Sequence, residues 1–250
     1  NQVSSQFRTG TTVAGSEFTL SSGITLDANG NLFVSDMGVS RVLKFVPGAS
    51  YGITVAGGNS YGSAMNQFSD PFGVAVDATG NLYVSDLSNY RVQKWAPGAT
   101  EGETVAGGNE FGSANNQLTP HGLAVDAVGN IYVADAGNHR VQKWAPGATV
   151  GVTVAGGNGV GYAPNQLYYP EGVALDAVGN IYVADMGNER IQKWAPGATA
   201  GVTVAGGNGW GSAANQFAFS SGVTVDASGN IYVTDGNNNR IQKWAPGATV

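Results

Sequence analysis

Residues 122–144 read GLAVDAVGNIYVADAGNHRVQKW, and the chain contains this stretch five times with small changes. The other copies occupy residues 23–45, 73–95, 172–194 and 222–244. Successive copies start 50 residues apart, with a single step of 49. A period of this length, rich in glycine and β-forming residues, is typical of a β-propeller or another closed array of repeats.

Each copy consists of short apolar runs that turn residues separate. In the second copy, the expected strands are 73–76, 82–85, 91–96 and 104–106. Between the first two, Asp77-Ala78-Thr79-Gly80-Asn81 is a tight turn, in which glycine supplies a positive φ and aspartate accepts backbone N–H bonds. Four antiparallel strands of this length make one propeller blade.

The fourth-strand sequence Thr-Val-Ala-Gly begins at Thr12, Thr54, Thr104, Thr153 and Thr203, and the last copy has none after it. We therefore expect Thr11–Ala14 to pair beside Ile241–Trp244 and to close the ring, because an open array would leave exposed strand edges. The prediction is one all-β domain, a five-bladed β-propeller of four-stranded antiparallel blades. Its blades lie near residues 16–58, 59–108, 109–157, 158–207, and 208–250 plus 10–15.

The charged residues follow the repeat. Ten of the eleven Lys and Arg, and ten of the seventeen Asp and Glu, recur at fixed repeat positions and cancel. The net charge of −6 comes from the remaining acidic residues against Arg8. Nucleic-acid and anionic-membrane binders need clustered basic residues, so we expect neither partner.

Other features of the composition limit the class of protein. The chain has no cysteine, so it needs no disulfide and its redox compartment stays open. No apolar run approaches the roughly 18 residues of a membrane span. Residues 1–7 lack the regions of a signal peptide, and the chain begins with Asn, so we expect a soluble, processed or excised segment.

The Gly-Asn turn, the following Asp, the Asn-x-Arg and the Val-Gln-Lys-Trp resemble the NHL repeat family, and the third copy spells Asn138-His139-Arg140. The resemblance covers nearly the whole chain and implies a propeller. Family propellers commonly have six blades, so a count of five leaves open excision from a longer array or idealisation by design.

Three repeated positions have structural and functional interpretations. The Asp and Arg five residues apart, such as Asp135 and Arg140, form either a charged binding ring or an ion pair that fixes the turn, and fivefold recurrence favours the ion pair. The Asp126 position is a turn cap rather than a calcium ligand, because its loop has one carboxylate. The aromatic at the Trp144 position is a wedge between blades rather than a stacking platform.

The copies differ most in the links between a fourth strand and the next first strand, where function is expected. Each long link carries one aromatic residue near its tip: Tyr61, Phe111, Tyr162 and Trp210. These rings either contact a sugar or protein partner or fold down over the neighbouring blade, and the sequence slightly favours the second interpretation. The link after Thr12 is about eight residues shorter.

A second variable set precedes the glycine of each first strand, at Ser22, Phe72, His121, Glu171 and Ser221. First strands line a propeller channel, so we expect these side chains at its mouth. Some relatives of this fold, such as the amidating lyases, hold a catalytic metal there with several histidines. Here only His121 and Glu171 are suitable ligands, fewer than the three that catalytic zinc usually has.

We expect a non-catalytic NHL-type scaffold that binds a protein or a glycan through its long-link face, as an extracellular or cell-surface monomer without a cofactor. The candidate ligand-binding residues are Tyr61, Phe111, Tyr162, Trp210, Phe72, His121 and Glu171. One alternative is a metal-assisted hydrolase or lyase at His121 and Glu171. Another is a designed, symmetrised or excised repeat scaffold without a selected ligand.

Overall fold

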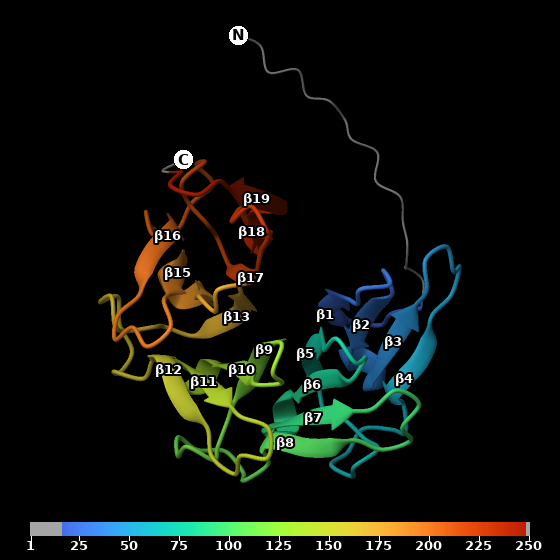
Figure 1. Ribbon diagram of the computed structural model, residues 1–250. Coiled ribbons are helices and arrows are strands. Elements are labelled where there is room, and N and C mark those ends of the chain that lie inside the picture. The colour runs from blue at the N-terminus through green and yellow to red at the C-terminus, as the bar shows by residue number, and fades with distance from the viewer. Residues whose placement is uncertain (1–16, 249–250) are drawn as a thin grey trace.

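The computed structural model describes residues 17–248, which form five antiparallel sheets arranged around a central channel (Figure 1). Blade 1 contains Ser21–Leu26 (β1), Leu32–Asp36 (β2), Arg41–Phe45 (β3) and Ile53–Gly57 (β4). Blade 2 contains Pro71–Val76 (β5), Leu82–Asp86 (β6), Arg91–Trp95 (β7) and Glu103–Gly107 (β8). Blade 3 contains Pro120–Val125 (β9), Ile131–Asp135 (β10), Arg140–Trp144 (β11) and Val152–Gly156 (β12). Blade 4 contains Pro170–Leu175 (β13), Ile181–Asp185 (β14), Arg190–Trp194 (β15) and Val202–Gly206 (β16). Blade 5 contains Ser220–Val225 (β17), Ile231–Asp235 (β18) and Arg240–Trp244 (β19).

The predicted fold, an all-β five-bladed propeller, is confirmed. The first strands β1, β5, β9, β13 and β17 lie innermost (Figure 1). Because the strands alternate in direction, the links and the turns between second and third strands share one end of the ring, the link face. The turns between first and second strands, and between third and fourth strands, share the other end, the turn face.

The turn aspartates hold the hairpins of the turn face. The Asp126 carboxylate accepts the Val128 and Asn130 amides at 3.1 and 2.9 Å, so the predicted turn cap is confirmed. At the equivalent turn of blade 1, the Asn31 side-chain amide donates to Asp27 at 2.6 Å. That hydrogen bond is the main reason why the pKa of Asp27 lies below its ordinary value.

The hydrophobic core lies between blades rather than within them. Tyr132 and Val141 of blade 3 pack with Val183 and Trp194 of blade 4, and Leu167 of the connecting link completes the cluster. Trp95, Trp144, Trp194 and Trp244 are 2–3% exposed. The aromatic position is therefore an inter-blade wedge, as the sequence indicates.

The first-strand glycines allow neighbouring blades to approach closely. A Cβ atom on Gly122 would lie 2.5 Å from the Glu171 carbonyl oxygen of the next blade, and one on Gly172 would lie 2.5 Å from the Ser221 carbonyl oxygen. For Gly222, the equivalent of blade 5, the nearest atoms among residues 17–248 belong to the Thr234 side chain of its own blade. The described part of the ring therefore shows this packing from blade 1 to blade 5 but not beyond it.

Blade 5 contains three strands within residues 17–248, and its outer strand is exposed. Ile241 is 64% exposed, whereas Ile191 of blade 4 is 0% exposed. On the first blade, Ile24 is 69% exposed, whereas Val74 of the second is 7% exposed. The predicted closing strand, residues 11–14, lies outside the described residues.

A buried carboxylate ties each blade to the link before it. Asp135 accepts hydrogen bonds from the Thr119 amide at 2.7 Å and from Arg140 Nε at 2.7 Å. Arg140 in turn donates to the Ala114 and Gln117 carbonyl oxygens of the link. The predicted Asp–Arg ion pair is confirmed in all five blades.

An asparagine extends this clamp in blades 2 to 5. Asn138 donates to both oxygens of Asp135 and to the Gly112 carbonyl oxygen. Blade 1 has Val39 at this position and follows a short link. In blade 1 the Gly52 amide donates to the Glu17 carboxylate. The equivalent amide of blade 3, that of Gly151, donates instead to a backbone carbonyl oxygen of the link.

A pair of glycine substitutions tests the blade packing. Gly122→Ala places a methyl group against the backbone of blade 4, so we expect a loss of about 1–3 kcal/mol or more in the free energy of unfolding. Gly222→Ala lies nearest to Thr234 of its own blade among residues 17–248 and should cost less. Urea titration measures both, and equal losses would show that β17 is covered in solution.

A pair of arginine substitutions tests the clamp. Arg190 and Asp185 are 3% and 0% exposed and 2.7 Å apart, so Arg190→Met should cost about 3–5 kcal/mol of unfolding free energy. Arg41 is 23% exposed and lies 3.3 Å from Asp36, which is itself 0% exposed, so Arg41→Met should also destabilise the protein but by less than Arg190→Met. Chemical denaturation of both variants gives the comparison, and the reverse order would contradict a stabilising role for burial of the pair.

Candidate functional site

The four long links, residues 58–70, 108–119, 157–169 and 207–219, are closed loops with internal hydrogen bonds. In the first, Asn59 Nδ2 donates to the Asn66 carbonyl oxygen at 3.0 Å, and Gln67 Nε2 donates to the Asn59 carbonyl oxygen at 2.8 Å. The other three repeat both bonds. Together with the Asp–Arg clamp, these hydrogen bonds fix the position of each loop tip.

The link aromatics point toward solvent. Tyr61, Phe111, Tyr162 and Trp210 are 54–66% exposed. More than half of each of these residues is exposed, which contradicts the interpretation that the rings fold down over the neighbouring blade. Each loop closes through its own amide side chains and does not need the ring. Tyr162 is the most anchored: its ring lies 4.4 Å from the Arg190 guanidinium, and its hydroxyl donates to the Gly207 carbonyl oxygen.

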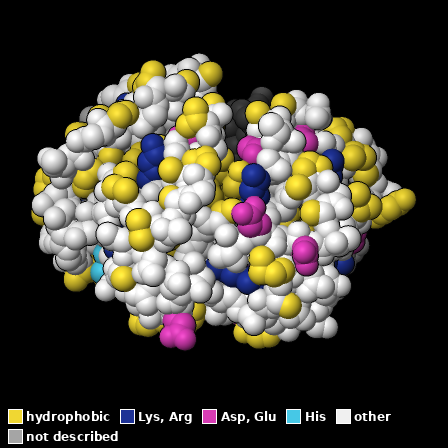
Figure 2. All heavy atoms as spheres, turned by 60° about the horizontal axis from the view of Figure 1, so that its bottom comes forward, with side chains coloured by type: hydrophobic (Ala, Val, Ile, Leu, Met, Phe, Trp, Pro, Cys, Tyr) yellow, Lys and Arg dark blue, Asp and Glu magenta, His cyan; other side chains and the backbone are white. Residues whose placement is uncertain are grey.

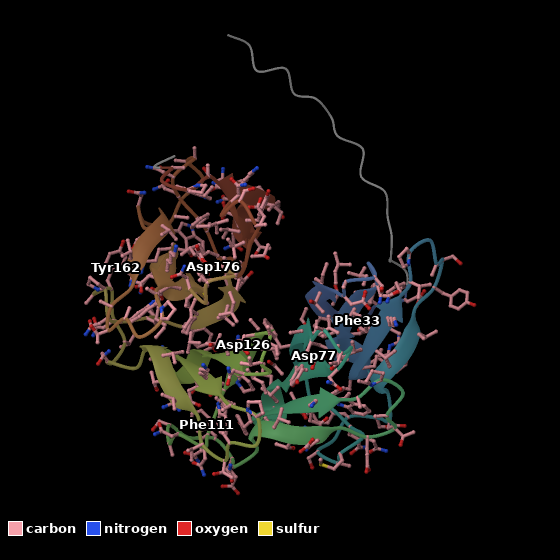
Figure 3. The ribbon with its side chains drawn as sticks, viewed as in Figure 1. Phe33, Asp77, Phe111, Asp126, Tyr162 and Asp176 are labelled. Carbon is pink, nitrogen blue, oxygen red and sulfur yellow. The ribbon has the colours of Figure 1, made fainter. Side chains whose placement is uncertain are left out.

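Exposed aromatic surface is concentrated on the link face. Eight aromatic side chains are exposed among residues 17–248, and seven of them belong to the links. These seven are Tyr61, Phe111, Tyr162, Tyr168, Tyr169, Trp210 and Phe219. Figure 3 shows Phe111 and Tyr162 at the outer rim of the ring, so these two loop-tip aromatics lie apart from the central channel.

The channel mouth is an inner site on the same face. Residues of all five first strands, with Ser22, Phe72, Glu171 and Ser221 at their starts, line a cavity of about 630 Å³. His121 is packed beside this cavity, with its ring 4.9 Å from that of Phe72. The structure thus gathers the five predicted mouth positions at one end of the channel.

His121 and Glu171 lie together at this mouth. Their Nδ1 and Oε1 atoms are 3.9 Å apart, and each residue is 7% exposed. Burial lowers the pKa of His121 to about 4, so its ring is neutral at pH 7. Burial raises the pKa of Glu171. The pair is therefore a neutral imidazole beside a poorly solvated carboxyl group.

Tyr169 is a mouth residue that the sequence analysis missed. Its ring lies 5.5 Å from that of His121 in an edge contact, and its backbone amide donates to His139 Nδ1 at 3.1 Å. The only sequence signal is its place two residues before Glu171. His139, which lies on a turn of blade 3, thus supports the mouth without belonging to it.

The basic side chains form no continuous patch on the face that Figure 2 shows, where they stand as separate spots. The five arginines pair with aspartates of their own blades. The lysines lie 5.3–5.8 Å from the aromatic ring of the neighbouring second strand. This distribution gives no support to a nucleic-acid site.

Two further observations concern the part of the chain that the structure describes. Residues 17–248 contain no group of three or more His, Cys, Asp or Glu side chains placed to hold a metal ion. Over the same range, no helix is long and apolar enough to cross a membrane.

A second cavity, of about 540 Å³, lies on the turn face between blades 1 and 2. Phe33, Lys44 and Trp95 are among its lining residues. Phe33 stands where the other blades have tyrosine, and the Tyr83 hydroxyl donates to the turn carboxylate of Asp77. Phe33 has no hydroxyl, so the turn carboxylate of Asp27 in blade 1 lacks the equivalent hydrogen bond. No cavity at this position was predicted from the sequence.

Known structures share this fold. An auxiliary nutrient binding protein from Bacteroides thetaiotaomicron superposes with a TM-score of 0.68 at 13% identity, over 92% of this chain and 60% of that chain. This chain thus spans less than two thirds of that protein. A gluconolactonase from Xanthomonas campestris gives 0.66 at 18% identity, over 92% and 76%. A chain of a nidogen/laminin complex gives 0.67 at 18% identity, over 90% and 80%. At these identities the likeness concerns the fold alone.

The sequence comparison adds the family. No curated protein matches the sequence. The family model described as NHL repeat matches residues 68–95, 118–144, 167–194 and 217–244. The unmatched first copy is the one that carries Val39, Leu43 and Phe45 in place of Asn, Gln and Trp. Four matched repeats and five blades together show that the chain belongs to the NHL-repeat β-propellers.

Proposed function

We propose that this propeller is a non-catalytic binding module whose partner docks on the link face. The observation that carries the proposal is the concentration of exposed aromatic side chains there, seven of the eight in the described residues. Aromatic side chains are enriched at protein interfaces relative to the rest of a protein surface.

The loop composition favours a protein partner. Each link combines Gly and Asn with one Tyr, Phe or Trp near its tip, and three of the four also contain Ser. Rigid aromatic rings that stand among small polar residues are also the composition of antibody binding loops. A glycan that stacks on the same rings is the alternative partner, and the experiment below separates the two.

Anchoring of the loops supports the same function. The clamp and the amide bonds hold the backbone of every long link, so the exposed rings start from fixed positions. Binding then requires less ordering of the loops, which reduces its entropic cost. Extracellular location and a monomeric state remain parts of this proposal.

A metal-assisted hydrolase or lyase at the mouth is the second candidate, because the structure brings His121 and Glu171 to 3.9 Å. Similar folds occur in a gluconolactonase from Xanthomonas campestris and in a streptogramin B lyase. Catalytic metal sites usually have three protein ligands, and the described residues add no third ligand to the pair. The geometry therefore supports binding better than metal catalysis.

The binding proposal is tested with two screens, a glycan array and a displayed random-peptide library. A link-face variant carries Tyr61→Ser, Phe111→Ser, Tyr162→Ser and Trp210→Ser. A control variant carries Val128→Ser and Val178→Ser, two side chains on the turn face that are each 75% exposed. Both variants should keep the thermal midpoint near that of the original chain, because they remove exposed side chains.

We expect hits from the peptide library that lose affinity by about tenfold or more in the link-face variant and keep it in the control, because buried aromatic anchors dominate most interfaces. Hits on the glycan array alone would replace the protein partner with a carbohydrate. Blank screens, or equal affinity in all three proteins, would contradict a binding role for the link face.

A further inference from the structure

A buried nitrogen at the channel mouth has no hydrogen-bond partner among residues 17–248. His121 Nδ1 is buried and unpartnered, and it lies 3.9 Å from Oε1 of Glu171, whose side chain lines the cavity. Each residue is 7% exposed. Buried polar groups in folded proteins are nearly always hydrogen-bonded, so an unpartnered Nδ1 next to a carboxylate that lines a cavity indicates a group that binds there.

The His121–Glu171 pair is confined to blades 3 and 4. Ser22 Oγ of blade 1 donates to the Pro71 and Phe72 carbonyl oxygens at 3.0 and 3.1 Å. Ser221 Oγ of blade 5 lies 3.0 Å from Thr234 Oγ1. Both serines thus have protein partners among the described residues, whereas His121 Nδ1 has none.

The geometry of the pair suits one donor group that serves both atoms. Nδ1 and Oε1 are 3.9 Å apart, which is too long for a direct hydrogen bond. For an atom that lies about 2.8 Å from both Nδ1 and Oε1, the angle between the directions to these two acceptors is about 90°. A nitrogen that carries three hydrogens meets this angle, with one N–H on each acceptor and the third directed elsewhere.

The charge of the pair favours a cation over a neutral hydroxyl. Burial keeps His121 neutral near pH 7, so the imidazole does not balance an ionised Glu171. The salt bridges of the described residues join all five arginines to repeat aspartates and join Glu171 only to His121. A hydroxyl group would leave the carboxylate charge uncompensated, whereas an ammonium group compensates it.

The walls of the site match such a ligand. The Phe72 ring, which belongs to a residue lining the cavity, and the Tyr169 ring lie beside the His121 ring, with centroids 4.9 and 5.5 Å from it. Beyond the mouth, the cavity of about 630 Å³ is lined by first-strand residues that include Val74, Leu123 and Val173. An aliphatic chain finds apolar surface there.

We propose that the mouth between blades 3 and 4 binds a primary alkylammonium group, held by His121 Nδ1 and the Glu171 carboxylate, with its alkyl chain in the channel. This proposal rests on the proposed function, since it names a ligand chemistry for the link face. The group can belong to a free amine or to a lysine side chain of a protein partner.

The test measures binding of n-butylammonium at pH 8 by NMR titration, with 1-butanol as the neutral ligand of similar shape. Nα-acetyl-lysine amide is the third probe and represents the lysine side chain. Glu171→Gln removes the charge at the site. Glu110→Gln is the matched control, because it removes a carboxylate from an exposed position of the same face that does not line the cavity.

We expect saturable, millimolar binding of n-butylammonium that Glu171→Gln weakens by about tenfold or more and Glu110→Gln leaves within about twofold. 1-Butanol should bind at least about tenfold more weakly than n-butylammonium, because it brings no charge. We also expect Glu171→Gln to keep or raise the thermal midpoint. Tighter binding of n-butylammonium than of the lysine probe would indicate a free amine, and the reverse would indicate a lysine side chain.

No saturable binding of n-butylammonium, equal binding of 1-butanol, or equal binding by Glu171→Gln would overturn the proposal. A large fall in thermal midpoint in Glu171→Gln would also overturn it, because the carboxylate would then have a structural role. These results leave the link-face experiment independent. If peptide hits still depend on the loop aromatics, the ammonium site alone is wrong.

Discussion

The buried aspartate at the end of each second strand is the interaction on which the link face depends. In blade 3, Asp135 accepts a link amide, an asparagine of the following turn and the arginine of the third strand. Its 0% exposure makes the unpaired charge costly, so the carboxylate requires all of these donors together. The link, the turn and two strands are thereby held as one unit in each complete blade.

The clamp fixes the base of each link and leaves the loop tip exposed. This arrangement explains how a chain of similar repeats can have a binding surface that differs from blade to blade. The repeated residues are used for the clamp, the turn cap and the inter-blade wedge. The residues that differ between copies lie at the loop tips and at the channel mouth. Trp210, His121 and Glu171 are examples, because no other copy has the same residue type at the equivalent position. A single binding site on a nearly symmetric ring needs this kind of local difference.

Much of this architecture could be predicted because it repeats. The strands, the wedge at Trp144, the cap at Asp126 and the Asp135–Arg140 pair each follow from a local rule applied five times. The exposure of Phe111 and the contact of Tyr169 with His121 do not, because they depend on how a long loop closes and which side chain of the next blade it meets. The ring closure expected from residues 11–14 stays a prediction.

Amide hydrogen exchange in Arg140→Leu tests most directly whether the clamp holds the link. Arg140 donates to the Ala114 and Gln117 carbonyl oxygens. The account predicts that exchange in residues 112–119 accelerates by about tenfold or more, while the amides of β13 and β14 in the next blade keep their rates. Unchanged exchange in residues 112–119, or an equal increase throughout the ring, would contradict it.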